Sequence, residues 1–173
     1  FDALMAENFF KLDNFKKAKK IYKDLSKRGE AFNWYSTKQL SRILIREEKK
    51  DQAIQLISNS YKELKNKNIY ETLDFANFLK NNEKFEESIS FYTSVIKKIK
   101  KDHPLYAEAA DGRGVAYERI GEWDKAEKDL LASLEVNPDQ AYVINYLAYS
   151  WIEKGIKVNK SLTMLEKANK LRS

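Results

Sequence analysis

The chain has 173 residues, of which 32 are Lys or Arg and 26 are Asp or Glu, giving a formal net charge of +6. Its hydrophobic fraction of 43% and charged fraction of 34% are those of a folded globular protein and exclude a disordered polyelectrolyte. The absence of Cys excludes disulfides, thiolate catalysis and cysteine-ligated metal sites, and a single histidine, His103, removes most histidine-based metal sites and proton relays. With 5 Gly and 2 Pro, we expect short loops and a mostly helical chain.

The two ends of the chain and its hydropathy bear on its location. No run of 18 uncharged apolar residues is present, so we expect no transmembrane segment. The chain starts at Phe1 in a segment that already resembles a helix, and no signal-peptide pattern precedes it. We therefore expect a fragment of a longer protein, for which cytoplasm and periplasm are both compatible.

A small residue recurs along the chain with a period near 35. The intervals between successive small residues are 35, 35, 38 and 35 positions. A bulky residue follows each small one by four positions, and a large residue precedes it by nine or ten. The small residues are Ala18, Ala53, Ser88, Ala126 and Ser161. Such a period indicates an array of repeated supersecondary units.

Apolar residues between these positions recur at helical spacing, so each unit is predicted to be a helix hairpin. The hairpins are expected at residues 1–28, 31–66, 69–100, 104–136 and 139–172, within a single domain spanning 1–173. The interval of 38 places an insertion near residues 101–106, which lengthens either the second helix of the third hairpin or the turn after it. Ala or Ser where two helices cross lets their axes approach to about 8–10 Å.

The chain resembles the tetratricopeptide repeat family, with about five repeats, and its segment 141–151 resembles bacterial members of the family. The fourth unit matches the family signature best, and the second and third units replace its turn glycine with Glu48 and Glu83. The matching residues of the fourth unit are Gly114, Ala116, Tyr117, Gly121, Ala126, Leu130 and Pro138. This resemblance implies an all-α fold, a right-handed superhelical solenoid of antiparallel helix hairpins. It also implies a non-catalytic scaffold or adaptor that binds a peptide or helix of another protein in a concave groove.

The resemblance further implies which side chains face that groove, namely those at fixed positions of the first helix of each hairpin. The candidates are Tyr35, Lys38, Arg42, Arg46, Tyr70, Asn77, Lys80, Asn81, Glu108, Asp111, Glu118, Tyr142, Asn145 and Tyr149. The same positions also include Leu73 and Val115. The groove is thus expected to be basic in the second unit, acidic in the fourth and tyrosine-lined in the fifth.

Two interpretations of this surface remain open. In the first, Lys38, Arg42 and Arg46 hold a carboxylate or acidic stretch of the partner, and Tyr142 and Tyr149 pack against an apolar or amide-rich segment. In the second, the face is simply solvated and its charges contribute little.

The sequence is also compatible with two other kinds of partner. Apolar side chains such as Leu4, Met5 and Phe9 are potentially uncovered at the first hairpin, which suggests a self-associating structural module. The lysine-rich run from Lys11 to Arg28 suggests binding to RNA or an anionic surface. We consider nucleic acid the weaker alternative, because on a helix those lysines are expected to spread around the polar arc.

An enzyme is not expected. His103 lies in the linker before the fourth hairpin, where a capping or exposed role is the simpler interpretation. Glu47 and Glu48 are adjacent, and side chains at i and i+1 do not converge on one face of a helix. Asp111 and Glu118 share a face, but neither a His nor a third carboxylate completes a metal site. No catalytic residue, metal or cofactor is therefore predicted.

Overall fold

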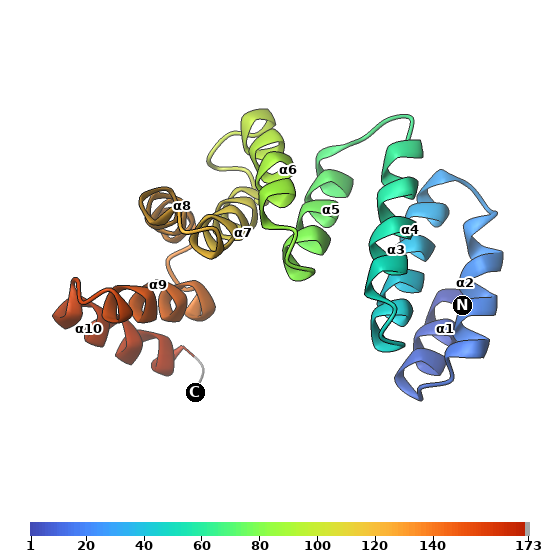
Figure 1. Cartoon of the computed structure of the whole chain (residues 1–173), viewed down its shortest axis with the longest axis horizontal. Helices are drawn as coiled ribbons and strands as arrows, with labels where there is room; N and C mark the ends of the chain where they lie inside the picture. The colour runs from blue at the N-terminus through green and yellow to red at the C-terminus, as the bar shows by residue number, and fades with distance from the viewer. Residues whose placement is uncertain (172–173) are drawn as a thin grey trace. The chain divides into compact units, whose positions relative to one another are not determined.

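The computed structural model describes residues 1–171, which form ten α-helices joined by short turns and contain no strand (Figure 1). The expected all-α fold is confirmed. The helices are α1 Asp2–Lys11, α2 Phe15–Ser26, α3 Glu30–Arg46, α4 Lys50–Glu63, α5 Ile69–Asn81, α6 Phe85–Lys98, α7 Tyr106–Arg119, α8 Trp123–Val136, α9 Ala141–Glu153 and α10 Val158–Lys170. Residues 172 and 173, which include the expected end of the last hairpin, lie outside the described range.

The chain divides into two compact units, Phe1–Phe78 and a second that begins at Leu79, so that the boundary falls within α5. In unit 1, α1 packs on α2, α2 on α3 and α3 on α4. In unit 2, α6 packs on α7, α7 on α8 and α9 on α10. The prediction of one continuous domain of five repeats stays a prediction.

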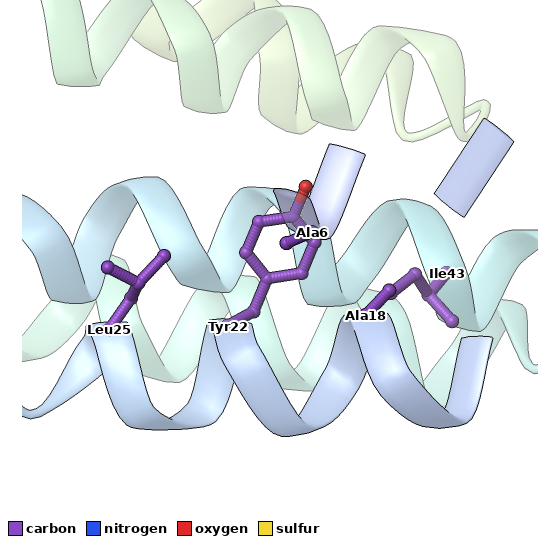
Figure 2. Close-up of a cluster of buried hydrophobic side chains, with 5 residues drawn as sticks. All are labelled: Ala6, Ala18, Tyr22, Leu25 and Ile43. Carbon is purple, nitrogen blue, oxygen red and sulfur yellow. The ribbon is translucent and has the colours of Figure 1, made fainter. Parts of the chain in front are cut away.

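The core of unit 1 is built around α2. Leu25, Tyr22 and Ala18 project from one side of this helix, together with Ala6 and Ile43 from neighbouring helices (Figure 2). Tyr22 is fully buried, and its hydroxyl bonds to the Glu7 carboxylate at 3.3 Å. The spacing of four and three residues along α2 is that of one helix face, which explains why the opposite face is left to charged side chains.

The core of unit 2 joins α7, α8 and α9. Val115, Leu130, Val143, Leu147 and Trp151 form one buried cluster, in which Trp151 has no exposed surface. Glu127 on α8 accepts a hydrogen bond from the Trp151 indole at 2.5 Å. This contact satisfies the polar atom of a buried aromatic and links α8 to α9.

The repeated small residues occupy the helix crossings, as predicted. All five have no exposed surface: Ala18, Ala53, Ser88, Ala126 and Ser161. At the crossing of α7 and α8, a Cβ added to Gly114 would lie 3.2 Å from the Ala126 carbonyl oxygen. The backbones are therefore close enough that only small side chains fit between them.

One turn geometry ends the first helix of each successive pair. The residue after the helix C-cap has a left-handed backbone in all five turns: Asp13 (φ 54°), Glu48 (61°), Glu83 (66°), Gly121 (83°) and Gly155 (66°). In the second turn the Glu48 amide bonds to the Ile45 carbonyl and the Lys49 amide to the Leu44 carbonyl. This pair of bonds is the Schellman motif, in which glycine is the favoured left-handed residue. The two glutamates that depart from the family signature thus adopt the backbone of the glycine they replace.

Replacing Glu48 with glycine is expected to raise the free energy of unfolding by roughly 0.5–1 kcal/mol. A left-handed backbone costs an L residue about 1–2 kcal/mol, and the greater chain entropy of glycine offsets part of the gain. Urea unfolding of the two proteins measures the difference. The Glu48→Ala variant is the matched control, because it removes the same exposed side chain and keeps the backbone cost; an equal gain in both variants would contradict the explanation.

The insertion between the third and fourth units lies in a turn. Helices α6 and α8 are both 14 residues long, so α6 is not lengthened. The extra residues instead form the connection 99–105 between Lys98 and Tyr106. His103 lies in this connection and accepts a hydrogen bond from the Leu105 amide at 3.1 Å.

Candidate functional site

The fourteen candidate groove residues fall on α3, α5, α7 and α9, and every one of them retains exposure to solvent. Six belong to unit 1: Tyr35, Lys38, Arg42, Arg46, Tyr70 and Asn77. Eight belong to unit 2: Lys80, Asn81, Glu108, Asp111, Glu118, Tyr142, Asn145 and Tyr149. Whether the two sets share one groove stays a prediction.

Two further residues at the same repeat positions are core residues. Leu73 is 3% exposed and Val115 is 6% exposed, so both side chains belong mainly to the core, although Val115 also lines the depression of unit 2 described below. Val115 packs against the cluster of unit 2 that contains Leu130 and Trp151. A branched aliphatic side chain at such a position gains more from neighbouring apolar side chains than from solvent.

The basic side chains of α3 are each paired with a carboxylate of unit 1. The Lys38 ammonium lies 2.5 Å from Asp74. The Arg42 and Arg46 guanidinium groups lie 3.3 Å from Glu7 and 2.8 Å from Asp13, respectively. These acids come from α1, the turn after it and α5, so the α3 face of unit 1 is a set of ion pairs. A carboxylate of a partner would have to compete with them.

An aromatic ring also holds the two arginines in place. The Arg42 guanidinium carbon lies 4.6 Å from the centre of the Phe10 ring, and that of Arg46 lies 5.9 Å from it. Cation–π contacts of this kind are worth about 0.5–1 kcal/mol at exposed sites. The arginines are thus bound to side chains of unit 1 through both their charge and their planar face.

Unit 2 contains an open depression of about 520 Å³ between the end of α5, α7 and α9. Its walls combine charge with apolar surface: Lys80, Asn81, Glu83, Phe85, Val115, Arg119 and Tyr142. Four of its side chains that were named above, Lys80 and Asn81 on α5, Val115 on α7 and Tyr142 on α9, were expected at the groove from their repeat positions. The depression therefore brings together predicted residues from three helices.

A partly desolvated charge pair lies on the same side of unit 2. Burial raises the pKa of Asp111 to about 7, while the Lys80 charge lowers it and the Glu108 charge raises it again. Burial also lowers the pKa of Lys80, which the charges of Asp111 and Glu108 partly offset. Asp111 consequently exchanges its proton near neutral pH, unlike an ordinary surface carboxylate.

Two tyrosines on α9 provide exposed aromatic surface. Tyr142 is 56% exposed and Tyr149 is 58% exposed, and their separation by seven residues places them on one face of the helix. Between them, Tyr146 is held by its hydroxyl, which donates a hydrogen bond to Glu118 at 2.7 Å. The Tyr146 and Tyr142 rings lie 6.0 Å apart. The exposed rings thus stand on a fixed helix face.

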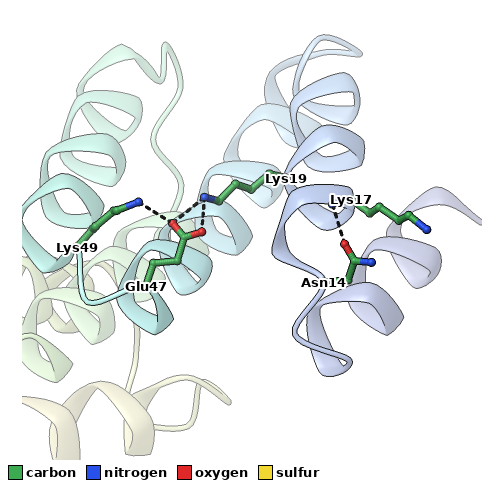
Figure 3. A network of polar contacts seen from close by, with 5 residues as sticks. All are labelled: Asn14, Lys17, Lys19, Glu47 and Lys49. Atoms are coloured by element: carbon green, nitrogen blue, oxygen red, sulfur yellow. Dashed lines mark hydrogen bonds and ion pairs between the residues drawn. The ribbon is translucent and has the colours of Figure 1, made fainter.

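The structure gives the remaining polar candidates ordinary structural roles. Glu47 accepts a hydrogen bond from the Lys19 ammonium at 2.5 Å and lies 3.2 Å from the Lys49 ammonium (Figure 3). These two cations lower the pKa of Glu47 and make it a poor general base.

Among residues 1–171 no group of three His, Asp or Glu side chains could hold a metal ion. Over the same range no helix is both long and apolar enough to cross a membrane.

Sequence reasoning missed a close contact and an ion pair within unit 2. The Tyr92 ring lies over Gly112, where an added Cβ would be 2.6 Å from it. Arg113 forms two bonds to Asp129, at 2.6 and 2.8 Å, and a third to the Thr93 hydroxyl at 3.1 Å. The only local signal of the Tyr92 contact was a glycine, Gly112, within a helix. The Arg113–Asp129 pair had no local signal, because the two residues are 16 positions apart in the sequence.

The comparisons with known proteins concern the fold. No protein-family profile matches the chain, and no curated protein sequence is significantly similar to it. Solved structures of MamA, a tetratricopeptide-like helical repeat protein, are similar to it. The fold is a tetratricopeptide-like array of helices.

These similarities extend over nearly the whole length of each chain. MamA from Desulfovibrio magneticus RS-1 has a TM-score of 0.73 and 13% identity, covering 99% of this chain and 93% of its own. An AMB-1 MamA has a TM-score of 0.71 and 17% identity, covering 99% and 98%. Because the sequence identities are below 20%, the similarity defines the fold alone, and function has to be argued from the side chains of this protein.

Proposed function

We propose that the protein is a non-catalytic interaction module, a scaffold or adaptor that binds a peptide or helix of a partner protein. The binding surface is the solvent-facing side of α7 and α9 in unit 2, with the depression at its centre. The observation that carries the proposal is the pair of exposed tyrosines on α9 beside that depression.

The chemistry of this surface suits a polypeptide ligand. Tyrosine rings give large contact area at low entropic cost and are enriched at protein interfaces. Lys80 and Arg119 can each bond to a partner carboxylate or carbonyl, and Asn81 can both donate and accept. Specificity then comes from the order of these groups along the surface, as in other helix-in-groove and peptide-binding modules.

The basic residues of α3 have a secondary role in this proposal. A second contact area in this proposal is formed by Lys38, Arg42 and Arg46. A partner carboxylate that binds there has to replace the carboxylates with which these residues already form ion pairs. Reversing their charges would also break those pairs and perturb unit 1. The tyrosines are the sharper test, because Tyr142 and Tyr149 are both more than half exposed and their truncation disturbs the core of unit 2 less.

Truncating both tyrosines, as Tyr142→Ala with Tyr149→Ala, is expected to weaken partner binding at least tenfold, because each ring supplies about 1 kcal/mol or more at an interface centre. A partner captured from bacterial lysate by the parent protein is purified and titrated by calorimetry against both proteins. Phe32→Ala is the matched control, since Phe32 is a 49% exposed aromatic of unit 1 outside the candidate positions. Equal loss in the control, or unchanged binding in the tyrosine variant, would contradict this surface.

Self-association is the second candidate, favoured by exposed apolar side chains at the first and last hairpins. Leu4 is 72% exposed on α1, whereas Val158 and Leu162 are 44% and 53% exposed on α10. A second copy of the chain could cover either surface. Sedimentation velocity over a range of protein concentrations decides this: a strict monomer at every concentration excludes self-association, and a dimer lost on Leu162→Ser supports it.

A further inference from the structure

The excess positive charge of unit 1 is concentrated on one helix. Residues 1–78 carry 16 Lys or Arg and 11 Asp or Glu. The three basic residues of α3 are neutralised as described, Arg28 lies 2.6 Å from Asp2, and Lys19 lies 2.5 Å from Glu47. Of the remaining basic residues, α2 carries Lys16, Lys17, Lys20 and Lys23 against a single acid, Asp24, and this helix lies on the side of unit 1 away from α4 (Figure 1).

Four lysines of α2 and its C-cap form a single row. Lys16, Lys20, Lys23 and Lys27 are all exposed and are separated by four, three and four residues. At 3.6 residues per turn these positions fall within an arc of about 60°, and the row is about 16 Å long. Lys27 lies 3.2 Å from Asp24, but both side chains are more than half exposed, so the pair is weak. Within residues 1–171 the other three lysines have no ion-pair partner.

The row is the centre of the polar arc around which the lysines of α2 spread. Lys17 and Lys19 lie on the two sides of the row, about 100° and 60° from Lys16 around the helix, and each has a neighbour in unit 1. The Lys17 ammonium lies 5.0 Å from the centre of the Phe9 ring, and Lys19 reaches across to Glu47, the C-cap residue of α3 (Figure 3). The lysines that are left share one direction.

We propose that this lysine row binds the surface of an anionic phospholipid bilayer. Lysine ammonium groups are point charges that suit a plane of mobile phosphate and carboxylate headgroups, and four to eight of them on one helix are enough for such adsorption. Unit 1 thereby rests on the lipid surface through the outer side of α2, while the proposed partner-binding surface belongs to unit 2.

An exposed apolar residue that precedes the row in the sequence favours lipid over nucleic acid. Leu12 is 77% exposed in the turn immediately before α2, between Lys11 and the row. An exposed leucine beside lysines is the combination that inserts into a headgroup boundary. The aromatic residues of α2 face the core instead: Tyr22 is buried, and Phe15 is half-buried against the same cluster. The outer side of α2 therefore has no ring on which a base could stack.

Vesicle co-sedimentation of the whole chain tests this proposal. The probes are vesicles of phosphatidylcholine mixed with phosphatidylserine and vesicles of phosphatidylcholine alone. The test variant is Lys16→Gln with Lys20→Gln and Lys23→Gln. The control is Lys97→Gln with Lys98→Gln and Lys100→Gln, which removes the same charge from three exposed lysines of unit 2. Circular dichroism confirms that both variants are folded.

The parent and the control variant are expected to bind only the anionic vesicles, and more weakly as salt increases. Each lysine near such a surface contributes about fivefold in partitioning, so the test variant should lose roughly a hundredfold. Leu12→Ser should weaken binding further without changing the salt dependence. Three outcomes overturn the proposal: no binding to anionic vesicles, equal loss in both triple variants, or row-dependent binding of oligonucleotides without binding of vesicles.

Discussion

Replacing Asp129 with alanine is expected to lower the free energy of unfolding by about 3 kcal/mol, the largest effect of any single polar substitution proposed for this protein. The Asp129 side chain is 9% exposed and that of Arg113 is 18% exposed. Without the carboxylate, the guanidinium keeps the Thr93 hydroxyl and the Tyr117 ring as neighbours, neither of which is an anionic partner that compensates its desolvation.

Glu135→Ala is the matched control for that experiment. Glu135 is on the same helix and also lies 2.6 Å from a cation, Lys101, but the two side chains are 67% and 48% exposed. Its loss should cost less than about 1 kcal/mol, because water screens an exposed pair. Urea unfolding followed by circular dichroism measures both. If the two variants lose the same stability, burial does not distinguish the two pairs.

Removing both partners separates the cost of an orphaned charge from the value of the pair. A double variant, Arg113→Met with Asp129→Leu, is expected to recover most of the stability, since apolar side chains of similar volume often replace a buried ion pair at little cost. A double variant as unstable as Asp129→Ala would instead show that the hydrogen bonds themselves hold α7 to α8.

Enlarging Ala126 to leucine is expected to destabilise unit 2 by about 1–3 kcal/mol through overpacking. Ala126 has no exposed surface, and its carbonyl is 3.2 Å from where a Cβ on Gly114 would lie. Alanine and leucine have similar helix propensities, so the change reports on the crossing of α7 and α8 rather than on helix formation.

Ala132→Leu provides the comparison, because Ala132 lies on the same helix and is only half-buried. Thermal unfolding should show a larger fall in Tm for Ala126→Leu than for Ala132→Leu. An unchanged Tm for Ala126→Leu would mean that the helices separate to admit the side chain at no cost, which is incompatible with a close crossing.

Local sequence determined most of the fold. The helices depend on apolar spacing within a few turns, the crossings on a small residue at a fixed place, and the turns on one left-handed position, each a matter of neighbours along the chain. Even Glu48 and Glu83, which lack the expected glycine, follow the geometry that the period assigns to them. The third-to-fourth insertion was also placed correctly, although sequence left open whether it lengthened a helix or a turn.

The ion-pair partners of the basic side chains, by contrast, were decided only by the tertiary structure. The sequence placed Lys38, Arg42 and Arg46 on an exposed face, which is correct, but their partners Asp74, Glu7 and Asp13 lie 33 to 36 residues away along the chain. In the same way, Lys17 meets the Phe9 ring and Lys19 meets the Glu47 carboxylate, whereas Lys16, Lys20 and Lys23 have no ion-pair partner among residues 1–171. Helical periodicity specifies which way a side chain points, whereas the charge that meets it depends on which other helix packs there.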